Sequence, residues 1–266
     1  MSTPPRAAGA HVGAILVAPV KGLRALAREQ VELHRGGVRE NRRFLLIDEQ
    51  GRMANGKRIA TLQAVIAEYS DAERTLSLTL PGRPPLRGGV ELGARLRATM
   101  FSSPLEVTEV LGPWSAVLSD HAGTPLRLVE AAGACGAVDR GADGPVSLIA
   151  RASVRRVAQQ ARRAGPLDPR RFRMLFEIDG VQAHAEDAWV GRGLAIGEAA
   201  VMARGHVGRC AVTTLDPDSG VRDFDTLEAL ASYRREAATT EPLACGIYGV
   251  VLEPGTVRVG DVVTPL

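Results

Sequence analysis

Residues 208–220 read GRCAVTTLDPDSG and place a cysteine between a basic residue and a turn. Arg209 directly precedes Cys210, and positive charge beside a thiol favours the thiolate, which is the form that acts as a nucleophile or a metal ligand. Two threonines follow, and the Asp-Pro-Asp-Ser-Gly sequence at 216–220 is typical of a turn. From these residues alone, a buried, unreactive cysteine is favoured, and a reactive cysteine is the alternative.

Outside this stretch, short apolar segments alternate with turn signals, a pattern typical of β strands. Strands are expected at residues 12–17, 29–33, 44–47, 52–54, 64–69, 75–80, 173–178, 199–202 and 247–253, with a last hairpin at 256–263 that turns at Gly260-Asp261. Helices are expected at 113–121, after a cap at Ser153, and at 226–235 after a cap at Asp225. The sequence therefore predicts a mainly β protein with some helix (α+β). We expect its sheet to close into a barrel, in contrast to a doubly wound parallel sheet.

The composition is that of an ordinary globular protein. The chain has 266 residues, of which 45% are hydrophobic and 24% charged, so it can bury a core without disulfides. Its net charge is +3 and its arginines are spread without a dense basic tract, so no nucleic-acid partner is expected. Of the 33 basic residues only Lys21 and Lys57 are lysines. A retained lysine favours a site that needs a compact ammonium group, and chance retention is the alternative.

Three cysteines, Cys135, Cys210 and Cys245, lie far apart and include no C-x-x-C pair. This spacing excludes an iron–sulfur cluster or a cysteine-rich zinc site built from this chain alone. The sparse, odd number suits a reducing compartment, so a cytoplasmic protein is expected. The apolar run at 12–20 is interrupted by glycine and proline and is too short to cross a bilayer, so no membrane association is expected.

Other motifs give weaker signals. Residues 51–57 match the G-x-x-x-x-G-K of a phosphate-binding loop, but Arg58 stands where that motif needs serine or threonine. A hairpin is expected there, so we interpret the match as accidental. His206 precedes Cys210 by four residues, which permits one shared metal, although a surface histidine is favoured. The chain contains neither H-E-x-x-H nor G-x-S-x-G.

Six further strings stand in one order along most of the chain. They are PVKG at 19–22, NRRF at 41–44, ADG at 142–144, RFR at 171–173, AEDAW at 185–189, and a closing pair formed by GIY at 246–248 and PGTVRVGD at 254–261. Together with 208–220, they resemble the MOSC family, which is named after the C-terminal domain of molybdenum cofactor sulfurases. The resemblance is strongest to its two-part members, which include the mitochondrial amidoxime-reducing component and bacterial relatives.

The resemblance implies a smaller MOSC N-terminal β-barrel-like domain at 10–100 and a MOSC-type β-barrel domain at 113–266. In cofactor-binding members the family cysteine is a thiolate ligand of molybdenum, a role that falls here on Cys210, and Asp143 would position the substrate or a proton. The residues that match the family's pterin-binding positions are Lys21, Gly22, Arg42, Gly144, Arg173, Arg209 and Tyr248.

The implied function is a molybdenum-cofactor oxidoreductase that reduces N-oxygenated small molecules such as hydroxylamines, amidoximes or hydroxamates. Two alternatives stay open: a sulfur carrier that uses a Cys210 persulfide, and a non-catalytic molybdopterin-binding module. The chain ends at Leu266 without a cysteine-rich domain, so a separate reductase, ferredoxin or b-type cytochrome is expected to supply electrons.

Five positions depart from the family pattern, and they put cofactor affinity and substrate identity in question more than the fold. Met174-Leu175 replaces Pro-Asn, and Gly208 stands where a hydroxyl residue is common. Lys57 replaces a common arginine, and Cys245 replaces a common phenylalanine.

Overall fold

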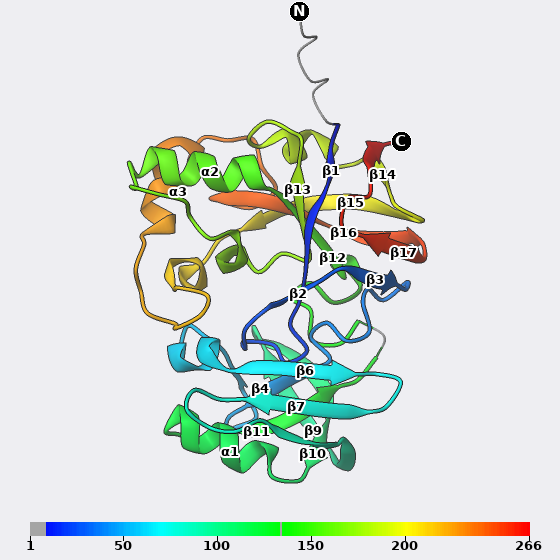
Figure 1. Ribbon diagram of the computed structural model, residues 1–266, viewed down its shortest axis with the longest axis vertical. Coiled ribbons are helices and arrows are strands. Elements are labelled where there is room, and N and C mark those ends of the chain that lie inside the picture. Colours follow the sequence, from blue (N-terminus) through cyan, green and yellow to red (C-terminus); the bar gives the residue numbers. More distant parts are fainter. Residues whose placement is uncertain (1–8, 134) are drawn as a thin grey trace, which may run out of the picture.

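Eight strands form one sheet in the upper half of the computed structural model, which describes residues 9–133 and 135–266 (Figure 1). Their order in the sheet is β18-β14-β15-β16-β12-β13-β1-β2. The strands are β1 (His11–Val17), β2 (Leu26–Arg28), β12 (Val146–Ala150), β13 (Phe176–Asp179), β14 (Gly193–Ile196), β15 (Ala199–Gly208), β16 (Ala244–Glu253) and β18 (Val263–Pro265). Backbone N–H groups of Gly260 and Val263 donate to Val12 O and Ala10 O, both at 2.8 Å. These bonds join the β18 edge to β1 and close the sheet into a barrel, as the sequence predicted.

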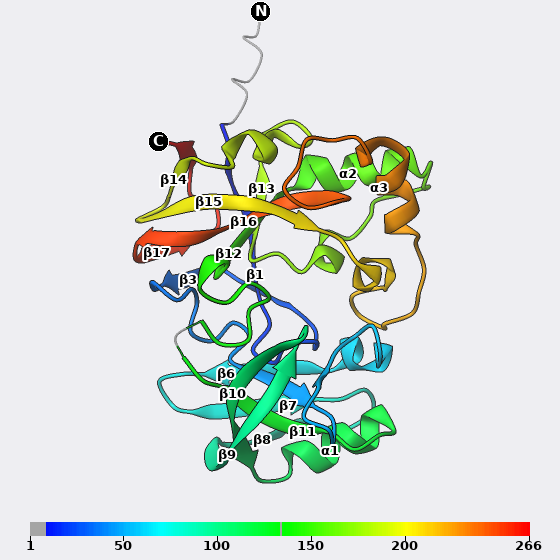
Figure 2. The ribbon, with the colours of Figure 1, turned by 180° about the vertical axis from the view of Figure 1, so that it is seen from behind.

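Apolar side chains that alternate along the strands fill the upper barrel. Ile15 on β1, Phe176 on β13 and Ile247 on β16 are fully buried there. Two helices, α2 (Arg151–Gln160) and α3 (Thr226–Arg234), pack together against the outside of the sheet (Figures 1 and 2). The Asp225 side chain accepts a hydrogen bond from the Glu228 N–H at 3.0 Å, so the predicted cap of α3 is confirmed.

The lower half contains a five-stranded sheet of order β5-β4-β11-β10-β9 and a three-stranded sheet of order β6-β7-β8. Its elements are β4 (Phe44–Ile47), β5 (Met53–Ala54), β6 (Ile66–Ser70), β7 (Thr75–Thr79), β8 (Leu86–Gly89), β9 (Glu91–Met100), β10 (Ser103–Leu111), α1 (Trp114–Ala122) and β11 (Arg127–Ala131). The Thr99 N–H donates to Gly51 O at 2.8 Å and closes the larger sheet. Phe44, Leu76 and Trp114 are buried between the two sheets and α1.

The two halves exchange segments across the predicted domain boundary. β1 and β2 come from the predicted first domain, 10–100, but belong to the upper sheet, and β3 (Gln30–Leu33) pairs with β17 (Gly255–Arg258). β11 comes from the predicted second domain, 113–266, and pairs with β4 and β10 in the lower sheet. The chain therefore crosses between the halves several times, and each crossing brings loops to the junction.

Three local predictions are wrong. Residues 256–263 do not form a hairpin with each other, because β17 pairs with β3 and β18 pairs with β14. Ser153 lies inside α2, whose N-cap is Ala150, and the Ser153 hydroxyl donates to the buried Glu186 carboxylate at 2.7 Å. The strand expected from residue 173 begins at Phe176, because Arg173 has a left-handed backbone (φ 55) at the end of a 3-10 helix.

Short 3-10 helices occupy much of the junction. They are η1 (Ala60–Ala64), η2 (Gly141–Asp143), η3 (Pro169–Phe172) and η5 (Ala211–Thr214), whereas η4 (Ala185–Trp189) packs against β12 and β16 in the upper half. Among the helices that the structure describes, none is both long and apolar enough to cross a membrane.

Candidate functional site

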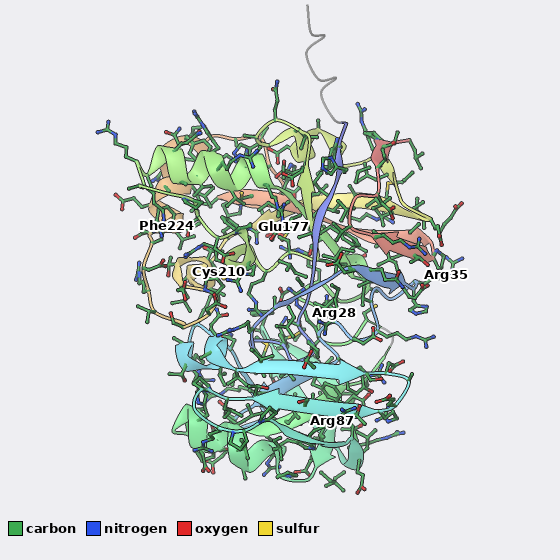
Figure 3. All side chains as sticks on the ribbon, viewed as in Figure 1. Arg28, Arg35, Arg87, Glu177, Cys210 and Phe224 are labelled. Carbon is green, nitrogen blue, oxygen red and sulfur yellow. The ribbon has the colours of Figure 1, made fainter. Side chains whose placement is uncertain are left out.

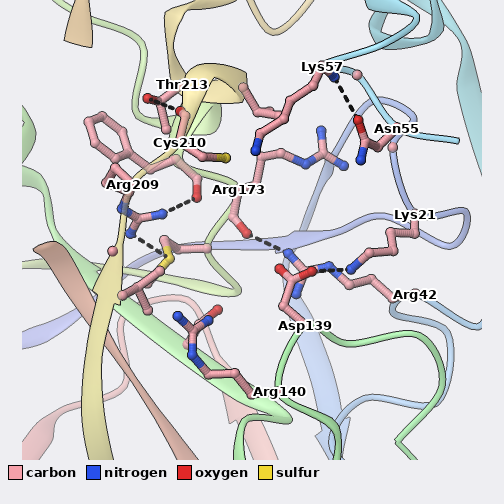
Figure 4. A pocket seen from close by; sticks show the side chains of 18 of the residues that line it. Lys21, Arg42, Asn55, Lys57, Asp139, Arg140, Arg173, Arg209, Cys210 and Thr213 are labelled. Atoms are coloured by element: carbon pink, nitrogen blue, oxygen red, sulfur yellow. Dashed lines mark hydrogen bonds and ion pairs between the residues drawn. The ribbon is translucent and has the colours of Figure 1, made fainter. Parts of the chain in front are cut away.

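A cavity of about 430 Å³ lies at the junction and is lined by segments of both halves (Figure 4). The lower half and the connections into it contribute residues at 21–22, 42, 53–57, 63 and 101, and the upper half contributes residues at 139–147, 171–174, 207–213, 241 and 248. Seven basic side chains and two carboxylates are among the described residues of this lining. The cavity is therefore strongly positive.

Cys210 lies two residues after the end of β15 and directly before η5, on the side of the upper half that faces the lower half (Figure 3). The Thr213 N–H and hydroxyl both donate to Cys210 O, at 3.1 and 2.9 Å, which fixes the turn that presents the thiol. Cys210 is exposed and lines the cavity. Cys245 on β16 is buried, and burial raises the pKa of its thiol to about 12. Cys210 is thus the cysteine that a ligand in the cavity can reach.

Arg42 and Arg173 form a fixed pair of guanidinium groups. Both have left-handed backbones (φ 53 and φ 55), and Arg42 Nη2 donates to Arg173 O at 2.9 Å. Arg173 donates to Leu23 O at 2.7 Å and to Gln63 Oε1 at 3.1 Å. Burial, together with the nearby positive charge of Arg42, lowers the pKa of Arg173 to about 10. Among the described residues no carboxylate pairs with either arginine, so their charge is available to an anion.

Lys21 lies next to this pair. Its Nζ donates to Ala137 O at 2.8 Å and forms an ion pair with Asp139. Burial lowers the pKa of Lys21 to about 8, although the Asp139 carboxylate opposes this shift. Burial alone would raise the pKa of Asp139, but Lys21 and Arg42 hold it well below its usual range. The aspartate therefore stays charged and fixes the lysine at the cavity wall.

Arg140 and Glu241 form a second ion pair in the lining, with Nη2 2.6 Å and Nε 3.1 Å from Glu241 Oε1. The Gly208 N–H donates to Glu241 Oε2 at 2.8 Å, and Arg140 lies 4.4 Å above the Tyr248 ring. A Cβ at Gly208 would come within 2.8 Å of Glu241 Oε2, and a Cβ at Gly144 within 2.7 Å of Arg140 Cβ. Both glycines therefore leave space for this ion pair.

Arg209 is used to build the wall. Its guanidinium donates to Cys245 O (2.7 Å), Phe172 O (2.9 Å) and Met174 Sδ (3.0 Å). These bonds fix the guanidinium in the wall, and because all three acceptors are neutral, its positive charge next to Cys210 is not paired with a carboxylate among the described residues. Met174 supplies a thioether acceptor to this guanidinium, and Leu175 packs in the barrel core without lining the cavity.

The structure brings nearly all predicted site residues together. Those that line the cavity are Lys21, Gly22, Arg42, Gly144, Arg173, Arg209, Cys210 and Tyr248. Asp143 does not line it: this residue is exposed in η2, and Asp139 of the same loop lies in the lining in its place.

Sequence reasoning also missed Lys57, Phe101, Arg140 and Glu241, which all line the cavity. Lys57 is the last residue of the G-x-x-x-x-G-K match at 51–57, which we interpreted as accidental. Its identity as one of only two lysines, the signal that pointed to Lys21, would have found it.

The described residues contain no group of three or more His, Cys, Asp or Glu side chains that could hold a metal ion. A metal at Cys210 would need further ligands from a cofactor. The cavity fits such a group, because one exposed thiol lies in a wall with unpaired guanidinium groups that suit a phosphate.

Comparison with known proteins agrees with this architecture. A family model of the MOSC domain matches residues 129–264, and a model of the MOSC N-terminal beta barrel domain matches residues 9–109. The chain belongs to the MOSC family.

Several curated relatives are mitochondrial amidoxime-reducing components. This MOSC protein is 27% identical to component 1 of Mus musculus in a match that covers 94% of this chain and 80% of the mouse protein. It is 39% identical to component 1 of Homo sapiens over 97 residues, which cover 34% of this chain and only 28% of the human protein. The crystal structure of the YuaD protein from Bacillus subtilis is 12% identical, covers 95% of this chain and 92% of that chain, and has a TM-score of 0.45.

Proposed function

We propose that this MOSC protein is a molybdenum-cofactor oxidoreductase that reduces N-oxygenated small molecules. The observation that carries the proposal is the exposed Cys210 thiol in a cavity rich in unpaired cations. The names of the curated relatives add support, because they describe proteins that reduce amidoximes.

Each part of the wall has a distinct task in this proposal. Lys21, Arg42 and Arg173 would hold the terminal phosphate of the pterin, since ionised donors make the stronger hydrogen bonds to phosphate oxygens. Cys210 would bind the metal, because a soft thiolate suits molybdenum. When bound, the cofactor would supply two-electron oxygen-atom chemistry. Asp139 holds Lys21 in place and, with its lowered pKa, is unsuited to donate a proton.

The reaction is balanced by two electrons and two protons: R–NH–OH + 2 e⁻ + 2 H⁺ gives R–NH₂ + H₂O. In this proposal the electrons come from another protein, since the three cysteines of these 266 residues are dispersed and match no cluster motif. A flavin reductase, a ferredoxin or a b-type cytochrome would meet that need.

Metal and pterin analysis of protein purified from a cofactor-producing host tests the proposal. We expect close to one molybdenum and one pterin per chain, reduction of benzamidoxime with reduced viologen, and no turnover with NADH or NADPH alone. Full loading without reduction of any N-oxygenated compound would favour storage or delivery of the cofactor. Absence of molybdenum together with a Cys210 persulfide would favour the sulfur carrier.

A further inference from the structure

Two exposed side chains from the lower half, Lys57 and Phe101, line the cavity but have no part in holding the cofactor as proposed above. Among the described residues no carboxylate lies within ion-pair distance of Lys57, whereas its neighbour Arg58 pairs with Asp48 at 3.0 Å. Lys57 is therefore a free cation in a cavity where Lys21 and Arg140 have carboxylate partners.

The backbone of the 55–57 loop is well fixed. Asn55 Oδ1 accepts from the Lys57 N–H at 3.0 Å, and Asn55 O accepts from the N–H groups of Arg58 and Ile59, both at 3.0 Å. At Gly56, a Cβ would come within 3.4 Å of Gln63 Nε2, so the loop packs closely on the residue that binds Arg173. The Lys57 side chain extends from this loop into the pocket where Arg173 and Cys210 lie (Figure 4).

Phe101 lies at the turn between β9 and β10, a long hairpin on the back of the lower half (Figure 2). Its side chain is 57% exposed, and its ring centroid is 5.6 Å from Lys21 Nζ. Leaving an aromatic ring in water forfeits the free energy that its burial would supply. A flat apolar group bound in the cavity would cover this ring.

Lys57 and Phe101 are exposed, whereas the residues proposed to hold the cofactor, Arg42, Arg173 and Lys21, are partly or fully buried. Arg42 and Arg173 are held by backbone carbonyls, as suits a ligand that stays bound. An exposed ammonium group on a flexible stem suits a ligand that enters and leaves. The rim composed of Lys57 and Phe101 therefore has the properties of a substrate contact.

We propose that Lys57 and Phe101 form a recognition rim that selects aromatic N-hydroxylated substrates carrying a carboxylate. The inference rests on the proposed function and narrows its substrate class. Lys57 binds the carboxylate by a charge-assisted hydrogen bond, and Phe101 packs on the substrate ring.

Steady-state kinetics of the molybdenum-loaded protein with reduced viologen test the rim, using benzamidoxime and 4-carboxybenzamidoxime as probes. We expect Lys57→Ala to raise KM for the carboxylated probe by about five- to tenfold and to change KM for the neutral probe less than about twofold, because a partly exposed ion pair is screened by solvent. Added salt is expected to raise the first KM in the unmodified protein but not in Lys57→Ala. Phe101→Ala is expected to raise KM for both probes equally.

Arg58→Ala is the matched control, because it removes an adjacent exposed cation that does not line the cavity. Equal effects of Lys57→Ala and Arg58→Ala, or equal effects of Lys57→Ala on both probes, would overturn the inference. So would a drop in pterin content in Lys57→Ala, because it would assign Lys57 to the cofactor.

Direct binding distinguishes failure of the rim from failure of the proposed function. If the loaded protein reduces neither probe, the proposed function is wrong, and calorimetric titration of the same protein with both probes still tests the rim. Tighter binding of the carboxylated probe that Lys57→Ala abolishes would support the rim without the reaction. Equal affinity for the two probes would reject it.

Discussion

Charged side chains occur in two regions of this molecule that differ in how the charges are paired. One is the cavity wall, and the other is a buried cluster formed by residues of η4, α2 and α3. In the cluster, Arg234 pairs with Asp187 at 2.7 Å, and the buried Glu186 accepts from Ser153 and from the Ala150 N–H. In the cavity, Arg42 and Arg173 bind only neutral acceptors. Because burying an unpaired charge is costly, the cluster is organised to stabilise the fold, whereas the cavity keeps positive charge for an anionic ligand.

The largest effect on activity is expected at the two cysteines that mark these regions. Cys210→Ala is expected to reduce activity to background without changing the melting temperature, because this thiol is exposed and packs against little. Cys245→Ala is expected to retain activity and to lower the free energy of unfolding by about 1–2 kcal/mol, because it leaves a small void in the core. Activity and thermal unfolding of both variants test this contrast. Full turnover and bound molybdenum in Cys210→Ala would contradict the assigned role.

Local sequence patterns predicted some of the short elements closely, whereas β8 to β12 and β14 were not predicted. The strand at 44–47, the strand from residue 75 and the helix that Asp225 caps lie within a residue or two of their predicted bounds. Each depends on alternating apolar residues or a cap, which neighbours in sequence determine. The pairing of β17 with β3 depends on contacts more than 200 residues apart, and the closing residues 256–263 carry no signal for that partner.

Site residues that belong to a recognisable motif were predicted from the sequence. Site residues that only the fold brings to the cavity were missed. The cysteine stretch and the RFR string predicted Cys210 and Arg173. Asp143 was proposed because it lies in the ADG string, and Asp139, which lies outside any such string, was not considered. The direction of a loop side chain depends on the packing of the whole loop. Lys57 was dismissed because its surroundings resembled a hairpin, and that reasoning could not foresee the chain crossings that place the loop at the junction.

The second prediction concerns the unpaired arginines. Arg42→Ala or Arg173→Ala is expected to weaken pterin retention by about tenfold or more, since each loses a charge-assisted hydrogen bond to phosphate. Arg170→Ala is the control, because Arg170 pairs with Asp168 and Asp218 and does not line the cavity. Fluorescence of the oxidised pterin after release measures retention. Equal losses in all three variants, with equal falls in melting temperature, would indicate general destabilisation.

A pH dependence of cofactor affinity follows from Lys21, whose pKa is about 8 in the free protein. An anion binds the protonated ammonium group more tightly, so binding draws a proton onto Lys21 near that pH. Affinity is therefore expected to be constant below about pH 8 and to fall above it, by up to about tenfold per pH unit. Pterin retention between pH 7 and 10 measures the effect. Lys21→Arg keeps its charge across this range, so an identical decline in that variant would exclude Lys21 as the cause.

The smallest effect on activity is expected at Glu186 in the buried cluster, where substitution changes the pH dependence of stability. Burial raises the pKa of Glu186 from 4.5 to about 7, against hydrogen bonds from Ser153 and the backbone that favour the carboxylate. Between these values the folded protein holds a proton that the unfolded chain releases, so the contribution of Glu186 to stability falls as pH rises from about 4.5 to about 7 and is constant above that. Glu186→Gln still accepts hydrogen bonds but cannot ionise.

Urea unfolding of the unmodified protein and of Glu186→Gln at pH 5 and pH 8 measures the contribution of Glu186. Titrating groups that the two proteins share cancel when their free energies of unfolding are subtracted. The variant is expected to lose less stability than the unmodified protein over this interval, by no more than about 3 kcal/mol. Its activity at pH 7 is expected to be unchanged, because the carboxyl does not line the cavity. Glu106→Gln is the matched control, since Glu106 is an exposed carboxylate paired with Arg97 at 3.1 Å on the surface. If the difference in stability between the unmodified protein and Glu186→Gln is the same at pH 5 and pH 8, Glu186 is ionised at both pH values, which would contradict its raised pKa. An equal loss of activity in Glu186→Gln and Cys210→Ala would contradict the view that the buried cluster serves stability and the cavity serves activity.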